Sequence, residues 1–151
     1  MIVYRIGRKK WANDLTGEGA RLHGGRWNNI GVPCLYTSGS RALSVLEYSC
    51  HVPIDDIPRA LTFTLYTIPD DAIFECAESD LPGNWRRLAH SGACRNYGSL
   101  LLSAGHLVLK LPSVVLPYEY NYLLNPAHPD FKTVITIHGV EDYAYDIRVK
   151  E

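Results

Sequence analysis

The sequence predicts a single α+β domain over residues 1–151, with a mixed, twisted β-sheet and flanking helices. A length of 151 residues fits one domain, and 46% apolar with 21% charged residues is ordinary globular composition. The segment from Leu61 to Ile68 alternates apolar residues with threonine, apart from Tyr66, and is typical of a strand. The segment from Ser40 to Cys50 has apolar residues at helical spacing. Interspersed strands and helices, without a repeat or a linker, favour one mixed sheet.

The first third of the chain predicts two strands joined by a loop. Met1 to Ile6 is expected to form the opening strand. Gly7 to Gly25 is polar and contains glycine without a clear period, so we expect a loop with at most a short helix near Trp11. Pro33 to Thr37 is an apolar run typical of a second, short strand.

The helix predicted at Ser40 to Cys50 carries a carboxylate beside its buried face. Ser40 is the expected N-cap, because a serine hydroxyl accepts a hydrogen bond from the first turn. Leu43, Leu46 and Cys50 form the expected buried stripe. Glu47 therefore lies at the edge of that stripe.

The remainder of the chain predicts two further helices and three further strands. The helices are expected at Pro82 to His90, with Trp85 and Leu88 facing inward, and at Tyr97 to Ala104. The strands are expected at His106 to Leu111, Asp130 to His138 and Tyr143 to Val149.

Composition and residue spacing exclude several classes of protein. A net charge of −1 and a pI near 6.6 give no basic field of the kind that nucleic-acid binders use. The four cysteines form no Cys-x-x-Cys pair and the N-terminus lacks the apolar stretch of a signal peptide, which favours a cytoplasmic protein with reduced thiols. The histidines are scattered, so no metal site is expected. No run approaches the roughly 20 apolar residues that span a bilayer, so no membrane contact is expected.

The segment His23 to Asn28 predicts a nucleotide pocket. Its glycines, Gly24 and Gly25, let the backbone come close to a ligand, and the planar head of Arg26 can bind phosphate bidentately. We expect Arg26 to converge with Tyr36 on the following strand and Glu47 on the helix. By spacing alone, an arginine after a glycine pair more often meets solvent or a surface carboxylate.

Several separated motifs, in order, resemble the RES domain family over nearly the whole chain. They are Tyr4-Arg5, Gly17 to Ala20, GGRWN at Gly24 to Asn28, LYTS at Leu35 to Ser38, Ala42 to Glu47, LPSVVLP from Leu111, and NYLLNPAHPDF at Asn121 to Phe131. The family often has an aromatic residue and leucine after a glycine in the third quarter, whereas Tyr97 to Leu102 contains no tryptophan. This departure concerns the lining of the pocket there.

The resemblance implies a toxin of a bacterial toxin-antitoxin pair, with a fold similar to that of ADP-ribosyltransferase toxins. Such a toxin destroys NAD, its substrate rather than a cofactor, by hydrolysis or phosphorolysis and so arrests growth. Some members are thought instead to transfer ADP-ribose to a protein. The resemblance also implies a cognate Xre-type antitoxin, with DNA contacted only through it, and allows a homodimer within that complex. A nucleotide-binding domain without turnover is the alternative that is not an enzyme.

Carried over to this sequence, the catalytic trio is Arg26, Glu47 and Ser113, and the residues expected to bind NAD are Arg26, Tyr36, Gly25, Trp27 and Asn125. A fixed carboxylate such as Glu47 stabilises the positive charge that builds on ribose when neutral nicotinamide departs. The competing interpretation is a structural ion pair between Glu47 and Arg26.

The other candidates also have structural alternatives. Tyr36 is expected to stack on a ring of NAD or to be an edge residue of the core, and Trp27 is more often core than stacking platform. Ser113 is expected to hydrogen-bond the nicotinamide amide or a ribose hydroxyl, and no nucleophile motif surrounds it. Asn125 is expected either to contact ribose or to begin an Asn-Pro turn, and His128 to belong to a loop.

Overall fold

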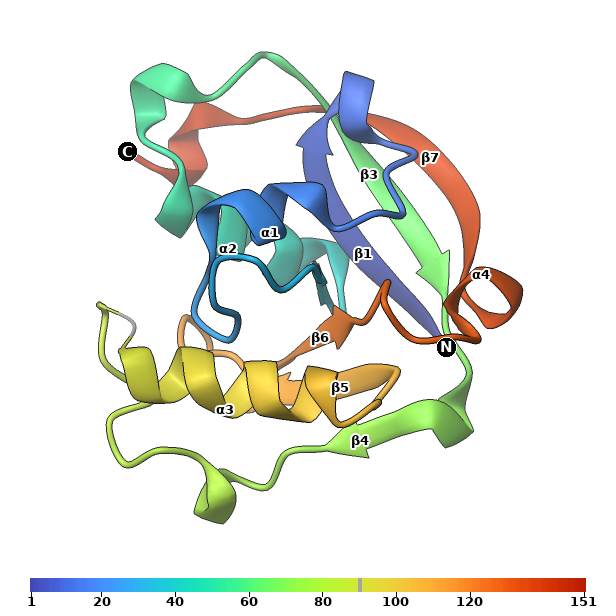
Figure 1. Ribbon diagram of the computed structural model, residues 1–151. Helices are drawn as coiled ribbons and strands as arrows, with labels where there is room; N and C mark the ends of the chain where they lie inside the picture. The colour runs from blue at the N-terminus through green and yellow to red at the C-terminus, as the bar shows by residue number, and fades with distance from the viewer. Residues whose placement is uncertain (90) are drawn as a thin grey trace.

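The computed structural model describes residues 1–89 and 91–151 as one mixed sheet flanked by helices (Figure 1). Within these residues the sheet has seven strands in the order β4-β5-β6-β2-β1-β3-β7. The strands are β1 (Ile2–Arg8), β2 (Leu35–Ser38), β3 (Ala60–Thr67), β4 (Ile73–Glu75), β5 (Val108–Pro112), β6 (Tyr120–Leu124) and β7 (Thr136–Ala144). Strands β4 and β5 are parallel, and the other neighbours are antiparallel. The α+β class and the mixed sheet are confirmed.

The sheet is almost split between β1 and β2. These two strands share a single pair of residues, Tyr4 and Ser38, whereas β1 pairs with β3 along its whole length and β2 pairs with β6 along its whole length. Beyond Tyr4 the two strands diverge, so the middle of the sheet opens. Main-chain N–H and C=O groups beside this opening are not paired between β1 and β2, so they can hydrogen-bond other groups.

Four α-helices occur in the part of the chain that the structure describes. They are α1 (Glu18–His23), α2 (Arg41–His51), α3 (Gly92–Ser103) and α4 (Phe131–Val134). Helix α2 packs against β1 and β2, beside the split. Ser40 is its N-cap, as predicted, and its side chain accepts a hydrogen bond from the Leu43 N–H. None of the described helices is long and apolar enough to span a membrane.

The two faces of the sheet have separate cores. On β6, Leu123 belongs to one core and its neighbour Leu124 to the other, because successive strand residues point to opposite faces. The Leu123 core includes Cys94 and Leu102 of α3, and Figure 1 shows α3 running along β5 on this side. Apolar side chains therefore pack on both faces of the sheet.

Most predicted elements of the first half are present. The opening strand, the strand before α2, the helix itself and the threonine-rich strand are β1, β2, α2 and β3, and the turn near Trp11 is a 3-10 helix. The buried stripe of α2 was partly wrong. Leu43 is buried, but Cys50 is exposed, and the polar residues Ser44 and Ser49 complete the buried face because they lie against other hydrogen-bonding groups.

The second half corrects several predictions. Residues 82–89 form turns rather than a helix, and residue 90, the end of that prediction, lies outside the described residues. Trp85 is buried as expected, whereas Leu88 is 94% exposed. The strand predicted at 130–138 is instead α4 followed by β7, and β7 ends at Ala144, so the strand predicted at 143–149 is also wrong. Helix α3 and strand β5 were predicted, while α1, β4 and β6 were missed.

Candidate active site

A cavity of about 990 Å³, here called the main cavity, lies at the split between β1 and β2. Its walls come from Arg5 and Ile6 on β1, from the glycine loop at residues 24–27, from β2, and from α2. Its volume is at the upper end of the range for small-molecule sites, which suits an extended ligand such as a dinucleotide.

Glu47 lies in the wall of this cavity with each carboxylate oxygen in a different environment. Its side chain is 19% exposed. Oε1 accepts hydrogen bonds from Ser113 Oγ at 2.8 Å and from Asn121 Nδ2 at 2.6 Å. Oε2 lies 3.5 Å from Nε2 of His51, one turn further along α2. The carboxylate is therefore anchored through Oε1, while Oε2 has the exposed imidazole of His51 beside it.

The surroundings of Glu47 favour its charged form. Burial raises the pKa of the carboxyl, but hydrogen bonds from His51, Asn121 and Ser113 outweigh it, and the pKa lies below its ordinary value. An anion is therefore present at neutral pH, as stabilisation of a developing cation requires.

Ser113 contacts Glu47 and does not line the main cavity. It follows β5 directly, is buried, and does not belong to the cavity wall. Its hydroxyl donates to Glu47 and accepts from the N–H groups of Val115 and Leu116, both at 3.1 Å. In this arrangement its one proton is donated to Glu47, and its predicted contact with nicotinamide or ribose stays a prediction.

Arg26 ties the glycine loop to the segment around residue 87. Nη1 donates to the carbonyl oxygens of Trp85 at 3.0 Å and Arg87 at 2.8 Å, and Nη2 donates to that of Leu88 at 3.1 Å. Among the described residues no ion pair joins Arg26 to Glu47, so the structural-pair interpretation is wrong. Arg26 and Leu88 both line the main cavity, and Arg26 keeps Nε and one Nη2 hydrogen without an acceptor in the described part of the chain.

The glycine pair acts through close packing. A Cβ on Gly25 would lie 2.6 Å from the Tyr36 hydroxyl oxygen, and Gly24 has a φ of +69°. The two N–H groups already donate within the protein, from Gly24 to Ala20 O at 2.8 Å and from Gly25 to Asn28 O at 3.1 Å. In this arrangement neither N–H group is free to donate to a pyrophosphate, and the predicted close approach of this backbone to a ligand stays a prediction. Gly25 shapes the wall.

Tyr36 is held in one orientation. Its hydroxyl donates to Asn28 Oδ1 at 2.6 Å and accepts from the Trp27 N–H at 3.1 Å, and burial raises its pKa well above the ordinary value. The ring lines the main cavity, but the hydroxyl is used internally. Burial also raises the pKa of the neighbouring Cys34 thiol to about 12, which leaves it unreactive.

Two further candidates have structural roles. Trp27 is 3% exposed and packs edge-on against Tyr97, with ring centroids 6.1 Å apart, so it is a core residue that contributes to the wall. Asn125 is buried away from the main cavity and donates to the carbonyls of Leu102 at 3.0 Å and His106 at 2.8 Å. Its amide joins α3 to the residues just before β5, and the predicted substrate contact by Asn125 stays a prediction.

Two residues that contact Glu47, His51 and Asn121, were not predicted to belong to the site. His51 lies four residues after Glu47, so it could have been found had the predicted helix been extended by one residue beyond Cys50. Asn121 begins the NYLLNP motif and lies opposite Ser38 in the pairing of β2 with β6. Because β6 was not predicted, nothing placed Asn121 near the carboxylate.

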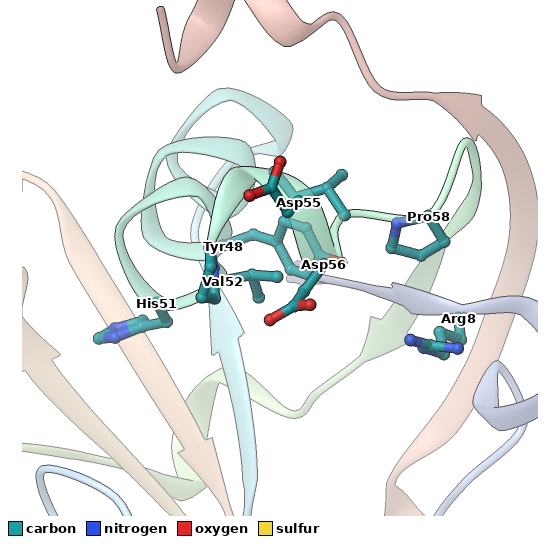
Figure 2. Close-up of a pocket in the computed structure, with 9 residues that line it drawn as sticks. Arg8, Tyr48, His51, Val52, Asp55, Asp56 and Pro58 are labelled. Carbon is teal, nitrogen blue, oxygen red and sulfur yellow. The ribbon is translucent and has the colours of Figure 1, made fainter.

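A second, smaller cavity shares Tyr48 and His51 with the main cavity. It has a volume of about 690 Å³ and is called the side cavity. Figure 2 shows His51 at one end, Arg8 at the other, and the carboxylate of Asp56 between them in this view. His51 therefore lies on the boundary between Glu47 and a neighbouring open space.

The fold and the site together define a one-domain α+β protein with an anchored carboxylate in the wall of a cavity at a split sheet. The sequence model of the RES domain matches residues 2–147, and the chain belongs to the RES domain family.

Two relatives are similar to this protein over almost the whole chain. A protein named Toxin Res from Photorhabdus laumondii subsp. laumondii is 35% identical over 151 residues, which is 99% of this chain and 97% of the relative. A protein named Prs ADP-ribosylating toxin from Sphingobium sp. (strain YBL2) is 37% identical over 143 residues, 91% of this chain and 88% of the relative.

The fold also has a solved counterpart. A chain in the crystal structure of the M. tuberculosis MbcT-MbcA toxin-antitoxin complex superposes with a TM-score of 0.65 at 17% identity, covering 95% of this chain and 84% of that chain. At this identity the likeness concerns the fold.

Proposed function

We propose that this protein is the toxin of a toxin-antitoxin pair and that it cleaves the bond between nicotinamide and ribose in NAD, which lowers cellular NAD and arrests growth. The observation that carries the proposal is the Glu47 carboxylate, ionised and anchored by Ser113 and Asn121 in the wall of a 990 Å³ cavity. Membership of the RES domain family supports it.

The chemistry needs one well-placed anion. Nicotinamide leaves NAD as a neutral molecule, so the leaving group needs no proton from the protein. Positive charge builds on the ribose as the bond breaks, and a preorganised carboxylate stabilises that charge more than it stabilises the ground state. With Oε1 held by two donors, Oε2 of Glu47 is the oxygen that faces the ribose.

Other residues bind and orient the dinucleotide. The ring of Tyr36 offers a fixed surface on which nicotinamide or adenine stacks. The Nε and Nη2 hydrogens that Arg26 retains donate to the pyrophosphate. NAD is the substrate in this proposal, and the reaction needs no cofactor.

A second candidate is transfer of ADP-ribose to a protein. It is favoured by the Sphingobium relative, which is named as a toxin that ADP-ribosylates Prs. Both candidates share the first step and differ in whether water, phosphate or a protein side chain captures the ribose.

We further propose an antitoxin that covers the main cavity. The structural likeness to a chain of a toxin-antitoxin complex supports a partner of this kind. An Xre-type antitoxin would supply any DNA contact, and it would be compatible with a homodimer of the toxin within the complex.

The test uses purified protein, freed of any partner, incubated with NAD in buffers with and without phosphate. Nicotinamide, ADP-ribose and its phosphorylated form are quantified, and labelled NAD is added to cell extract to detect a modified protein. We expect nicotinamide release by the natural chain, its loss in Glu47→Gln, and its retention in Glu75→Gln. Glu75 is a suitable control because it lies on the edge strand β4, where its exposed carboxylate contacts Lys110.

The products decide between the candidates. Free ADP-ribose or its phosphorylated form identifies degradation of NAD, whereas a labelled protein band without free product identifies transfer. An absence of nicotinamide release and of labelling under all conditions contradicts the proposed activity.

A further inference from the structure

Asn121 connects the candidate catalytic carboxylate to the strand beside it. Its Nδ2 donates to Glu47 Oε1 at 2.6 Å, and its Oδ1 accepts from Ser38 Oγ at 2.7 Å. Ser38 and Asn121 are directly opposite each other in the pairing of β2 with β6. A hydrogen-bonded chain therefore runs from β2 through β6 to α2.

This chain has one direction when Glu47 is ionised. A carboxylate only accepts hydrogen bonds, so the amide must present its NH₂ group to Glu47. The amide oxygen then faces Ser38, which must donate its single proton. The Glu47 carboxylate thus sets the orientation of the Asn121 amide, and the Ser38 hydroxyl completes the chain by donating to the amide oxygen.

We propose that Asn121 is a positioning residue that fixes the Glu47 carboxylate for cleavage of NAD, a role that rests on the function proposed above. Without Asn121, Oε1 of Glu47 would be held by Ser113 alone. Asn121 adds a second donor from a different element, because Ser113 follows β5 and Asn121 lies on β6. Together they fill Oε1 and leave Oε2 toward the main cavity.

Asn121 is a neutral hydrogen-bond donor to Glu47, whereas several other groups near Glu47 are charged or titratable. His51 contacts Oε2 from the same helix. The other such groups that line the main cavity are Arg5, Asp14, Arg26, Cys34, Tyr36, Tyr48 and Cys50. No acidic group among the described residues contacts Oε1, so an acid introduced at position 121 would be the first.

The test measures the pH dependence of kcat and KM for nicotinamide release. Asn121→Asp keeps the shape but replaces the donor by a second carboxyl group, so Glu47 gives up its proton less readily. We expect the acid limb of the kcat profile to move to higher pH, with kcat at the acid end lowered about tenfold, and KM changed by less than about threefold. Asn121→Ala and Ser38→Ala should move the limb in the same direction by less.

Asn96→Asp is the matched control. Asn96 is exposed on α3, where its Oδ1 accepts from Asn29, so the same substitution adds a charge away from Glu47. Its profile should match that of the natural chain. A raised KM with an unmoved acid limb in the Asn121 variants would overturn the proposal, since it would indicate direct substrate binding by Asn121.

A second readout needs no NAD. A carbon-13 NMR titration of the Glu47 carboxyl should show a higher pKa in Asn121→Asp and Asn121→Ala than in the natural chain. An unchanged titration in both variants overturns the positioning role even if NAD is cleaved. Conversely, a raised pKa in a chain that never releases nicotinamide would contradict the proposed function and leave the contact between Asn121 and Glu47 established.

Discussion

Gly98 of α3 lies directly against the main chain of Trp27. A Cβ at position 98 would be 1.9 Å from the Trp27 carbonyl oxygen and 2.8 Å from its carbonyl carbon. Main-chain atoms cannot move aside as a flexible side chain can. The helix and the GGRWN loop are therefore packed as closely as two segments of backbone allow, which fixes the loop that carries Gly25 and Arg26.

Gly98→Ala should accordingly destabilise the fold. We expect a loss of about 3 kcal/mol in the free energy of unfolding, because overpacking a rigid contact costs that order of energy. Gly92→Ala, in the first turn of the same helix, has open space around its Cβ and should be neutral or stabilising by up to about 1 kcal/mol. Urea denaturation of both variants checks this, and equal stabilities would contradict the close contact.

The elements that were predicted correctly depend on local signals. The alternation of threonine in β3 and the serine N-cap of α2 each depend on a few residues close together in the sequence, so they can be recognised without knowing the rest of the chain. The strand β6 has only five residues and follows a proline-containing turn, and its pairing with both β2 and β5 is what makes it a strand. Such pairing is not visible in a local window.

In the site, too, some residues could be predicted from local sequence signals and others depend on long-range pairing. Arg26, Tyr36 and Glu47 were placed together in advance and do line one cavity. Their hydrogen-bond partners could not be predicted, because Asn121 reaches Glu47 only through the register of β6. Asn125, four residues later, was predicted to contact a ligand. In the structure its amide donates to the main-chain carbonyls of Leu102 in α3 and of His106, just before β5.

Gly25→Ala should abolish nicotinamide release, and it should lower the free energy of unfolding by less than Gly98→Ala does. The new Cβ would lie 2.6 Å from the Tyr36 hydroxyl oxygen and push the ring into the main cavity. Gly19→Ala also lines the cavity but meets nothing within 4 Å, so it should retain activity. Tyr36→Phe combined with Gly25→Ala removes the nearest clashing atom and should recover part of the activity. The recovery is only partial because the ring carbon Cζ would still lie 2.9 Å from the new Cβ, and full activity in Gly25→Ala alone would contradict the clash.

Arg26→Lys should loosen the segment around residue 87 as well as lower activity. A lysine ammonium cannot replace a planar head that donates to the carbonyls of Trp85, Arg87 and Leu88 at once. Hydrogen exchange of the amides at residues 85–88 should therefore speed up. Arg86→Lys, which alters an exposed cation beside the ring of Trp85, should leave that exchange unchanged. Unaltered exchange in Arg26→Lys would contradict a role in holding this wall.

The ionisation of Glu47 should make it a pH-dependent source of stability. Its pKa is lower in the folded chain than its ordinary value, so its contribution is complete above the ordinary carboxyl pKa of about 4.3 and is lost as the pH falls through the lower, folded value. The difference in Tm between the natural chain and Glu47→Gln should therefore shrink as the solution is acidified across that window. A constant difference would mean that Glu47 is not selectively stabilised as an anion.

Ser113→Ala should lower kcat for nicotinamide release without abolishing it. The hydroxyl donates to Glu47 and accepts from two main-chain N–H groups, so its loss frees one side of the carboxylate and relaxes the turn after β5. Loss of one such hydrogen bond to a charged group corresponds to about 1.5–3 kcal/mol, or a decrease of roughly 10- to 150-fold in kcat, with KM little changed. Removal of a true nucleophile costs about a million-fold. Single-turnover kinetics with saturating NAD separate the two cases, and a residual rate near the uncatalysed background would show that Ser113 takes part in the chemistry itself.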